Sequence, residues 1–211
     1  MSLLKIKNLK TYFHTRAGIN RAVDDISFSI DKGEIVGVVG ESGSGKSVMI
    51  KCLVGLMQPD SGSIKVMGKD ITKLRQTALD ELRTAIGFLF QGSALYDSMT
   101  VRENLEFPLR KFPEYANKSE QLVLEALESV GLKSAIDLMP EELSGGMKRR
   151  ITLARAIILR PKIIIYDEPT TGLDPITSKE IIELMKGIQQ KFKTSSLIIT
   201  HDMDCARVIS N

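Results

Sequence analysis

Hydrophobic and polar residues alternate along the first thirty positions of the chain, and unbroken apolar runs follow. The segment SLLKIKNLK (2–10) predicts a half-buried β-strand, and RAVDDISFSI (21–30) predicts a second strand, closed by the turn DKGE. IVGVVG (35–40) is a continuous apolar run that ends in glycine, which is typical of a central parallel strand. From Ser47 to Leu56 the apolar residues recur at helical spacing until QPDSG interrupts them. The chain therefore opens with strands and turns to helix directly after a buried strand.

The later part of the chain repeats this alternation of short apolar runs and helical periods. Two strands are expected around SIKVMG (63–68) and IGFLF (86–90), with a helix over roughly 77–84 between them. KIIIYDEP (162–169) and SSLIITHD (195–202) predict two buried strands, joined by the helix SKEIIELMKGIQQKF. Such alternation favours parallel pairing, with helices on both faces of the sheet.

Strand-like runs disappear between residues 91 and 150. VRENLEFPL, KSEQLVLEALESVGL and KRRITLARAIIL are all helical in period. We therefore expect a single domain over residues 1–211. It would have an α/β core at about 1–91 and 151–211 and an inserted helical lobe at about 92–150.

The composition fits one compact domain. The chain has 211 residues, of which 43% are hydrophobic, enough for a single core. The formal net charge of +3 is too small to indicate a nucleic-acid partner. The one tight basic cluster, Lys148-Arg149-Arg150, is interpreted as a solvated helix face.

The cysteines and the hydropathy of the chain indicate in which cellular compartment the protein is expected. Cys52 and Cys205 show neither metal nor redox spacing, so we interpret both as free thiols in a reducing compartment. Near the N-terminus apolar residues alternate with lysines, so this segment lacks the apolar run of a signal peptide. No segment approaches the roughly 18 to 20 apolar residues that span a bilayer. If the protein acts at a membrane, another chain must hold it there.

The segment GESGSGKS, from Gly40 to Ser47, fits the phosphate-loop pattern G-x-x-x-x-G-K-[ST] between an apolar strand and a helix. Its glycines let the backbone wrap closely around a phosphate, and the helix N-terminus adds positive potential. Lys46 supplies a charge for the β- and γ-phosphates, and Ser47 supplies a hydroxyl for Mg²⁺. The alternative is a chance glycine-rich turn. The residues expected to bind nucleotide here are Gly40, Ser42, Gly43, Ser44, Gly45, Lys46, Ser47 and Val48.

A second chemical pair lies at the end of the strand IIIYDE. Asp167 would emerge at the carboxyl edge of the sheet, where ligands collect in such folds, and suits Mg²⁺ bound through a water. Glu168 can orient or deprotonate an attacking water. The alternative is a pair of strand-end carboxylates that cap the next helix. Together with the phosphate loop, the pair indicates a nucleoside triphosphatase.

The segment ELSGGMKRR opens a helix with Ser144, Gly145 and Gly146 but holds no nucleophile, acid or metal ligand. A hydroxyl and free amides at a helix N-terminus form an anion site. This chain already has a loop for one triphosphate, so the helix would serve a nucleotide held by a different chain. The alternative is an ordinary N-cap serine.

At this point the sequence resembles the ABC ATPase family. LSGGM looks like its signature motif and is followed by RRITLARAI, while Gln91 matches the Q-loop glutamine. TGLDP matches the D-loop, with Asp174 as its acid, and His201 after LIIT matches the switch histidine. The resemblance runs from about Leu4 to the last residue. Family members usually continue with a further strand pair and helices, so we expect more sequence beyond this point.

The resemblance implies a P-loop NTPase core with a mainly parallel sheet flanked by helices, an N-terminal antiparallel β region and an inserted helical subdomain carrying the signature. Two ATPase domains would meet head to tail, with Ser144 and Gly146 on the partner's γ-phosphate. ATP and Mg²⁺ would be the cofactors. The implied catalytic residues are Glu168, His201, Gln91 and Lys46. The implied metal-binding residues are Ser47, Gln91 and Asp167.

In that family an aromatic side chain from the first strand-loop stacks on adenine. Phe13 falls at the matching place in NLKTYFHT, and its neighbour Tyr12 is the alternative. An aromatic residue at a strand end is otherwise a packing residue.

Two subfamilies compete for the cargo. FQGSALYDSMTVRENLEFPLR and LMPEELSGGMKRR look like the ATPases of Mla-type phospholipid transporters that work with MCE-domain proteins. The front of the chain, NLKTYFHTRAGINRAVDDISFSI, reads more like di- and oligopeptide importer ATPases. We favour lipid, because the helical lobe and Q-loop are where ABC ATPases touch their membrane subunits. The expected setting is the cytoplasmic face of the bacterial inner membrane. The expected partners are integral permease subunits and an MCE-type lipid-binding protein, with no nucleic acid.

Two other classes stay open. ABC ATPases that act on DNA or ribosomes usually carry two ATPase domains or a long inserted arm, and this chain has neither. A scaffold that binds ATP without turnover often lacks the carboxylate that Glu168 supplies.

Overall fold

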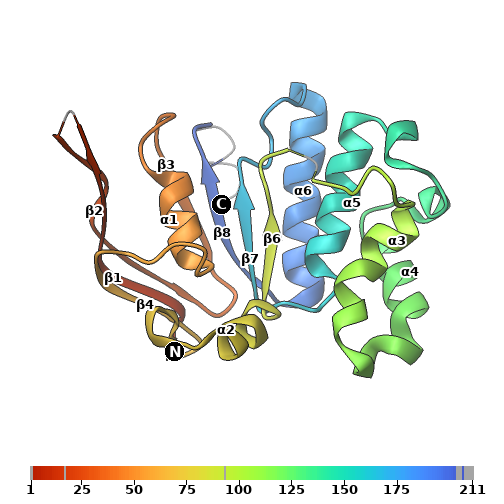
Figure 1. Ribbon diagram of the computed structural model, residues 1–211. Coiled ribbons are helices and arrows are strands. Elements are labelled where there is room, and N and C mark those ends of the chain that lie inside the picture. The colour runs from red at the N-terminus through yellow and green to blue at the C-terminus, as the bar shows by residue number, and fades with distance from the viewer. Residues whose placement is uncertain (1, 17, 93, 203–205, 207–211) are drawn as a thin grey trace.

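The computed structural model describes residues 2–16, 18–92, 94–202 and 206, and these form two four-stranded sheets with helices between and beside them (Figure 1). The antiparallel sheet has the order β2-β1-β4-β5, and the parallel sheet has the order β3-β8-β7-β6. The antiparallel strands are β1 (Ser2–Thr15), β2 (Gly18–Asp31), β4 (Ser61–Val66) and β5 (Lys69–Asp70). The parallel strands are β3 (Ile35–Val39), β6 (Ile86–Leu89), β7 (Ile163–Asp167) and β8 (Ser195–Thr200).

Six α-helices are assigned in the described part of the chain, with short 3₁₀ turns between them. The α-helices are α1 (Lys46–Leu53), α2 (Gln76–Arg83), α3 (Val101–Glu106), α4 (Ser119–Ser129), α5 (Gly145–Ile157) and α6 (Pro175–Phe192). The 3₁₀ turns are Ile71–Lys73, Phe107–Lys111, Pro113–Lys118, Lys133–Ala135 and Pro140–Glu142. Every helix and strand expected from the periodicity is present, so the fold class is confirmed.

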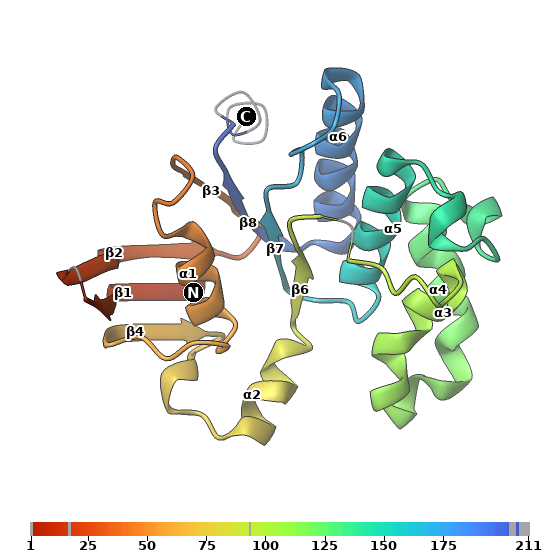
Figure 2. The ribbon, with the colours of Figure 1, turned by 45° about the horizontal axis from the view of Figure 1, so that its top comes forward.

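The strand β7 shows how the core is divided. Ile164 and Tyr166 point to one side of the parallel sheet and pack with α5 and α6. Ile163 and Ile165 point to the other side and pack with α1, α2 and the antiparallel sheet. Because successive residues of a strand face opposite ways, an all-apolar strand must be covered on both faces. Figures 1 and 2 show the resulting layers, with α1 on one side of the parallel sheet and α6 and α5 on the other.

The prediction that the run at 35–40 forms a central strand is wrong. In the described residues β3 pairs only with β8 and lies at the edge of the parallel sheet. The run is apolar for another reason. Ile35 packs against the core on the α5–α6 side, and Val36 and Val38 pack against the core on the α1 side. The edge strand is thus covered on both faces, although Val39 near its end is 39% exposed.

The part of the chain between β6 and β7 is helical in its described residues. The helices α3, α4 and α5 bury Val101, Leu105, Val123 and Leu127 in one continuous core with β7 and β8. The helix α5 runs without a break from residue 145 to residue 157. It therefore joins the helical region to the sheet as one rigid element.

The basic cluster at 148–150 is not the solvated face that the sequence predicted. Arg149 is only 4% exposed, whereas Lys148 and Arg150 are half-buried. The helix α5 packs between the sheet and the helical region, so most of its circumference is covered. Arg149 faces this interior.

Cys52 is a free thiol in the buried face of α1, as expected, and burial raises its pKa. Cys205 lies outside the described residues. No helix among the described residues is long and apolar enough to cross a membrane.

Candidate functional site

The phosphate-loop residues form the turn from β3 into α1. Gly43 and Gly45 have φ angles of 82° and 87°, a conformation that favours glycine because it has no Cβ. A Cβ at Gly45 would lie 1.8 Å from the carbonyl oxygen of Ala22 in β2. The loop therefore packs directly on the backbone of the antiparallel sheet, and only glycine fits at this position.

The helix α1 begins without a side-chain cap. Its N-cap is Gly45, which offers no side-chain acceptor, so the first N–H groups of the helix face the loop. The Nζ of Lys46 donates to the carbonyl oxygens of Gly40 and Glu41, the latter at 2.8 Å. The same Nζ lies 4.0 Å from Oε1 of Glu168. Amides and an ammonium group thus converge at one point, which is an arrangement suited to phosphate.

The loop borders a hollow of about 370 Å³, which we call the loop hollow. It is lined by residues from both sheets, from α1 and from the segments that follow β6, β7 and β8. The lining residues are Phe13, Asn20, Ala22, Ser42, Gly43, Gly45, Lys46, Ser47, Val48, Gln91, Asp167, Glu168 and His201. Every catalytic and metal-binding residue expected from the sequence is among them. Gly40 and Ser44 belong to the same loop but do not line the hollow; a Cβ at Gly40 would lie 2.7 Å from Oγ of Ser44.

Asp167 and Glu168 lie at the carboxyl end of β7, and their pKa values are shifted in opposite directions. Burial raises the pKa of Asp167, the neighbouring charge of Glu168 raises it further, and Lys46 offsets only part of this. Burial would also raise the pKa of Glu168, but hydrogen bonds from His201 and Thr171 outweigh it and hold that pKa below its usual value. Glu168 is therefore the carboxylate whose ionised form this structure favours.

Glu168 is buried and fixed by several donors. Its Oε2 accepts from Nδ1 of His201 at 2.8 Å and from the hydroxyl of Thr171 at 3.1 Å. Its backbone has a φ of 49°, a left-handed conformation that is uncommon for glutamate, and its N–H donates to the carbonyl of Ile199 at 2.8 Å. Such backbone conformations cost roughly 1–3 kcal/mol and cluster at functional sites. The structure therefore holds this carboxylate in place at some cost to stability.

The loop hollow offers oxygen donors of the kind that Mg²⁺ prefers. The hydroxyl of Ser47, the amide of Gln91 and the carboxylate of Asp167 all line it. Among the described residues, no group of three or more His, Cys, Asp or Glu side chains forms a closed metal site. This fits Mg²⁺, which keeps several waters and usually takes its remaining ligands from substrate phosphates.

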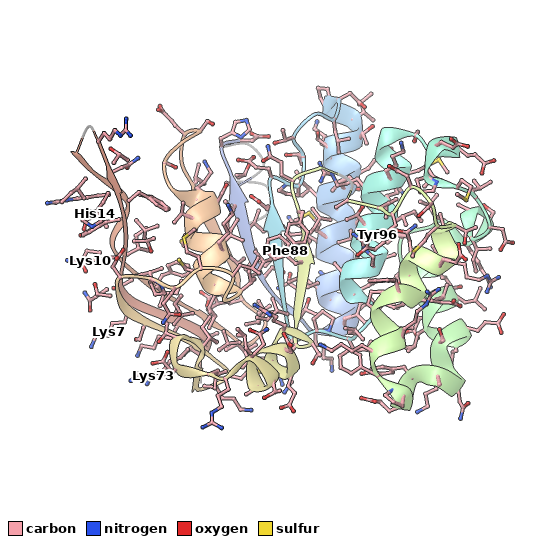
Figure 3. The ribbon with its side chains drawn as sticks, viewed as in Figure 1. Lys7, Lys10, His14, Lys73, Phe88 and Tyr96 are labelled. Atoms are coloured by element: carbon pink, nitrogen blue, oxygen red, sulfur yellow. The ribbon has the colours of Figure 1, made fainter. Side chains whose placement is uncertain are left out.

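Phe13 and Tyr12 point to different environments. Phe13 is 38% exposed and lines the loop hollow, opposite Asn20 in the β1–β2 register. Tyr12 does not line it, and its hydroxyl donates to Oδ1 of Asp24. The geometry favours Phe13 as the aromatic surface beside the phosphate loop. His14 lies with Lys7 and Lys10 on the outer side of the antiparallel sheet, away from the hollow (Figure 3).

The signature residues lie in a separate hollow of about 490 Å³, which we call the signature hollow. Ser144, Gly145 and Gly146 line it together with Asp174 from the segment before α6. The remaining lining residues are Leu132, Met147, Arg150, Gly172, Leu173, Thr177 and Glu180. The two hollows share no residue, so Ser144 and the phosphate loop of the same chain do not border one space.

Ser144 and Asp174 both act as helix N-caps in this structure. Oγ of Ser144 accepts from the N–H of Met147 at 3.2 Å. Oδ1 of Asp174 accepts from the N–H groups of Ile176 and Thr177, each at 3.0 Å. The capping interpretation therefore holds for the isolated chain, and it leaves Gly145 exposed at the mouth of the signature hollow.

Sequence reasoning missed three residues that shape the site. Asn20 and Ala22 line the loop hollow from β2, and the hairpin register opposite Phe13 was the signal that could have identified them. The sequence predicts Arg149 on a solvated helix face, yet its guanidinium donates to the carbonyl of Phe90, next to Gln91. No one-dimensional pattern distinguishes that arginine from its two basic neighbours.

One solved structure with a similar fold is a nucleotide-bound dimer. The chain aligns with the ATP-binding cassette MJ0796, solved as a dimer in a post-hydrolysis state bound to ADP and Pi, with a TM-score of 0.86. The sequences are 31% identical, and the alignment covers 97% of this chain and 90% of that one.

Curated relatives include transporters with different cargo. The methionine import ATP-binding protein MetN of Rhizobium johnstonii is 43% identical over 198 residues, 93% of this chain and 54% of the relative. The intermembrane phospholipid transport ATP-binding protein MlaF of Haemophilus influenzae is 40% identical over 206 residues, 96% of this chain and 76% of the relative. This chain thus spans about half the length of the MetN protein and three quarters of the MlaF protein. The ABC transporter family profile matches residues 23–171, which include the phosphate loop, the signature and the β7 carboxylates. The phosphate loop, the signature helix and these matches together show that the chain belongs to the ABC transporter family of ATPases.

Proposed function

We propose that this chain is the ATP-hydrolysing subunit of a membrane transporter and works as a head-to-tail pair. The observation that carries this proposal is the separation of the two hollows, which share no lining residue. The loop hollow has the phosphate loop, the β7 carboxylates and His201, whereas the signature hollow has the N-terminus of α5 with Asp174 beside it. In a head-to-tail pair, the signature hollow of each chain faces the loop hollow of the other.

Each residue of the loop hollow has a distinct role in this proposal. Lys46 and the first amides of α1 hold the phosphates, and Phe13 stacks on the base. Glu168 orients the attacking water and accepts its proton, because it is buried and ionised beside the loop. His201 positions that carboxylate through the bond from Nδ1. Ser47, Gln91 and Asp167 would hold Mg²⁺, which would neutralise charge on the phosphate oxygens.

The partner chain contributes the signature hollow. Ser144, Gly145 and Gly146 present a hydroxyl and free amides, and Asp174 borders them. Two opposed helix N-termini neutralise a triphosphate better than one does. The dimeric ADP-bound structure of MJ0796 supports this arrangement by similarity. The pair closes with ATP and loosens after hydrolysis.

The test is Glu168→Gln, which keeps the shape of the side chain and removes its basicity. We expect ATP binding to persist, hydrolysis to fall by about 100-fold or more, and a dimer to accumulate with ATP. Light scattering coupled to size exclusion would measure the dimer. Glu183→Gln, on the exposed face of α6, is the matched control and should behave like the original chain. A Glu168→Gln chain that binds ATP yet stays monomeric at all concentrations would contradict the shared site.

For the cargo we propose phospholipid, with the chain bound peripherally to permease subunits at the cytoplasmic face of a bacterial inner membrane. The support is the helical region, whose sequence resembles Mla-type ATPases, and the similarity to MlaF over 96% of the chain. In this proposal residues of about 92–150 form the subdomain that meets the membrane subunits, and about 1–91 and 151–211 form the nucleotide-binding core. An MCE-type lipid-binding protein would belong to the same assembly.

A second candidate is amino-acid import, favoured by the MetN relatives at 43% identity. The two candidates differ in what stimulates turnover. The complex would be purified from native membranes through a tag on this chain and its permease identified by mass spectrometry. ATPase activity raised by phospholipid in nanodiscs, and indifferent to methionine, supports lipid transport. Stimulation by methionine with a periplasmic binding protein supports import instead.

A further inference from the structure

Arg149 of α5 is a buried arginine whose hydrogen bonds reach two separate loops. Its Nη1 donates to the carbonyl oxygens of Phe90 at 3.1 Å and Gly92 at 3.2 Å. Its Nη2 donates to the carbonyl oxygen of Thr171 at 3.3 Å. One guanidinium therefore joins α5 to the segment after β6 and to the segment after β7.

Both segments carry residues of the loop hollow. Phe90 and Gly92 flank Gln91 on either side, so their carbonyls fix the backbone from which its side chain projects. The hydroxyl of Thr171 donates to Oε2 of Glu168 at 3.1 Å. Arg149 thus supports two reactive positions at once, although it does not line the hollow itself.

A second arginine of α5 contacts the later part of the segment after β6. Arg155 donates to the carbonyl of Ala94, and its guanidinium lies over the ring of Tyr96 at 5.6 Å from the centroid. Figure 3 shows Tyr96 beside α5. Asn104, fully buried, accepts from the N–H of Tyr96 at 2.8 Å and donates to its carbonyl at 3.1 Å. The residues around Gln91 are thus held to α5 at both ends.

Burying the charged guanidinium of Arg149 costs free energy, which a residue that only filled space would not require. Among the described residues, only carbonyl oxygens accept hydrogen bonds from Arg149, and no ion pair to a carboxylate is assigned to it. An apolar side chain of similar volume usually stabilises a protein interior as well as a buried charge does. A planar guanidinium, however, offers several donors in fixed directions and can bridge carbonyls from different loops, which an ammonium group does poorly.

We infer that Arg149 is a positioning residue that couples the signature hollow of this chain to its loop hollow. The N-terminus of α5 lines the signature hollow, and Arg149 lies in the second turn of the same helix. A movement of α5 on engaging the partner's nucleotide therefore carries Gln91 and the Thr171 segment with it. This inference rests on the proposed function, since it assigns Arg149 a part in the shared reaction.

The test compares Arg149→Met with Lys148→Met, its neighbour on α5. The backbone of Lys148 bonds within the helix, but its side chain has no assigned hydrogen bond or ion pair among the described residues. Three quantities are measured on the full chain: the ATP dissociation constant, kcat for hydrolysis, and deuterium uptake by mass spectrometry. For Arg149→Met we expect kcat to fall by about tenfold or more with an unchanged dissociation constant, because misplaced groups slow chemistry without weakening binding. Uptake should rise together at residues 90–92 and 169–174. Lys148→Met should match the original chain in all three.

Each outcome decides the inference. Unchanged kcat in folded Arg149→Met, or higher uptake in only one of the two segments, overturns it. If Arg149→Met does not fold, Arg149→Lys carries the same measurements, because it keeps the charge but cannot bridge both loops. If the original chain hydrolyses no ATP, the proposed function fails, and the paired rise in uptake still tests the coupling alone.

Discussion

At the scale of single residues, the site depends on backbone positions that few side chains can occupy. Glu168 adopts a φ of 49° directly after β7, and Gly45 approaches the carbonyl of Ala22. Both positions bring a functional group to the loop hollow: Glu168 brings its carboxylate, and Gly45 brings the N-terminus of α1. They are also positions at which a small substitution should have a large and specific effect.

Replacing Phe13 with alanine should weaken nucleotide binding. Stacking of a base on an aromatic ring contributes about 1–3 kcal/mol, so the ATP dissociation constant should rise by about tenfold. Fluorescence titration with a labelled ATP would measure it. Tyr12→Ala is the control, because Tyr12 does not line the hollow. A larger effect at Tyr12 than at Phe13 would reassign the base-stacking role to Tyr12.

Replacing Gly45 with alanine should destabilise the fold more than the same change at Gly43. Both have left-handed backbones, which cost a non-glycine residue roughly 1–3 kcal/mol. A Cβ at Gly43 meets nothing within 4 Å, whereas one at Gly45 lies 1.8 Å from a backbone oxygen. Urea unfolding of the two variants would separate conformational cost from steric cost. Equal destabilisation of the two variants would show that the loop can shift away from the Ala22 carbonyl in β2 without a measurable cost in stability.

At the scale of elements, helix caps set how the chain enters its helical region. The helix α3 begins with a capping box in which Thr100 and Glu103 bond each other's backbone N–H groups, at 2.8 Å and 3.2 Å. Hydrogen bonds from the backbone and hydroxyl of Thr100 hold the pKa of Glu103 below its ordinary value of 4.5. The ionised carboxylate therefore stabilises the folded chain.

This depressed pKa predicts a specific pH dependence. The contribution of Glu103 should be complete above pH 4.5 and should disappear as the pH falls through the lower folded-state pKa. Glu103→Gln keeps an oxygen acceptor but cannot ionise. The difference in unfolding free energy between the two chains, measured in urea from pH 7 to pH 3, should shrink toward acid. A difference that is constant over this range would contradict the linkage.

Elements with a clear hydrophobic period could be predicted from the sequence, and so could the residues carried by short motifs. The segment from Gly43 to Ser47 could be assigned from local sequence, because it lies between the end of a strand and the start of a helix. Asp167 and Glu168 could be assigned in the same way, because they lie at the end of a strand. The edge position of β3 was missed because apolar content records burial of faces, not the number of neighbouring strands. The burial of Arg149 was missed because it depends on which side of α5 meets the loops, a property of tertiary packing.

At the scale of the whole molecule, the proposed head-to-tail pair depends on the two separate hollows of one chain. A complete site would contain the loop hollow of one copy and the signature hollow of another. Damage to either hollow should therefore inactivate a symmetric pair, whereas a mixed pair could keep one intact site.

Mixing two inactive variants tests this directly. Lys46→Ala damages the loop hollow, and Gly145→Asp places a negative charge in the signature hollow. A Cβ at Gly145 meets nothing within 4 Å, and an acid near a helix N-terminus favours the helix, so the fold should tolerate it. Random pairing leaves half of the dimers mixed with one intact site of two, so activity should recover to at most about a quarter. No recovery above the separate variants would contradict a shared site.

The place of β3 has a consequence for synthesis on the ribosome. Among the described residues its one sheet neighbour is β8, which begins at Ser195, some 160 positions later. Contacts between such distant segments form late, because the intervening loop must first be closed. While β8 is still inside the exit tunnel, the strand that carries the phosphate loop has no sheet to join. A nascent polypeptide should therefore pass through most of its translation unable to capture ATP, and it should acquire that ability abruptly.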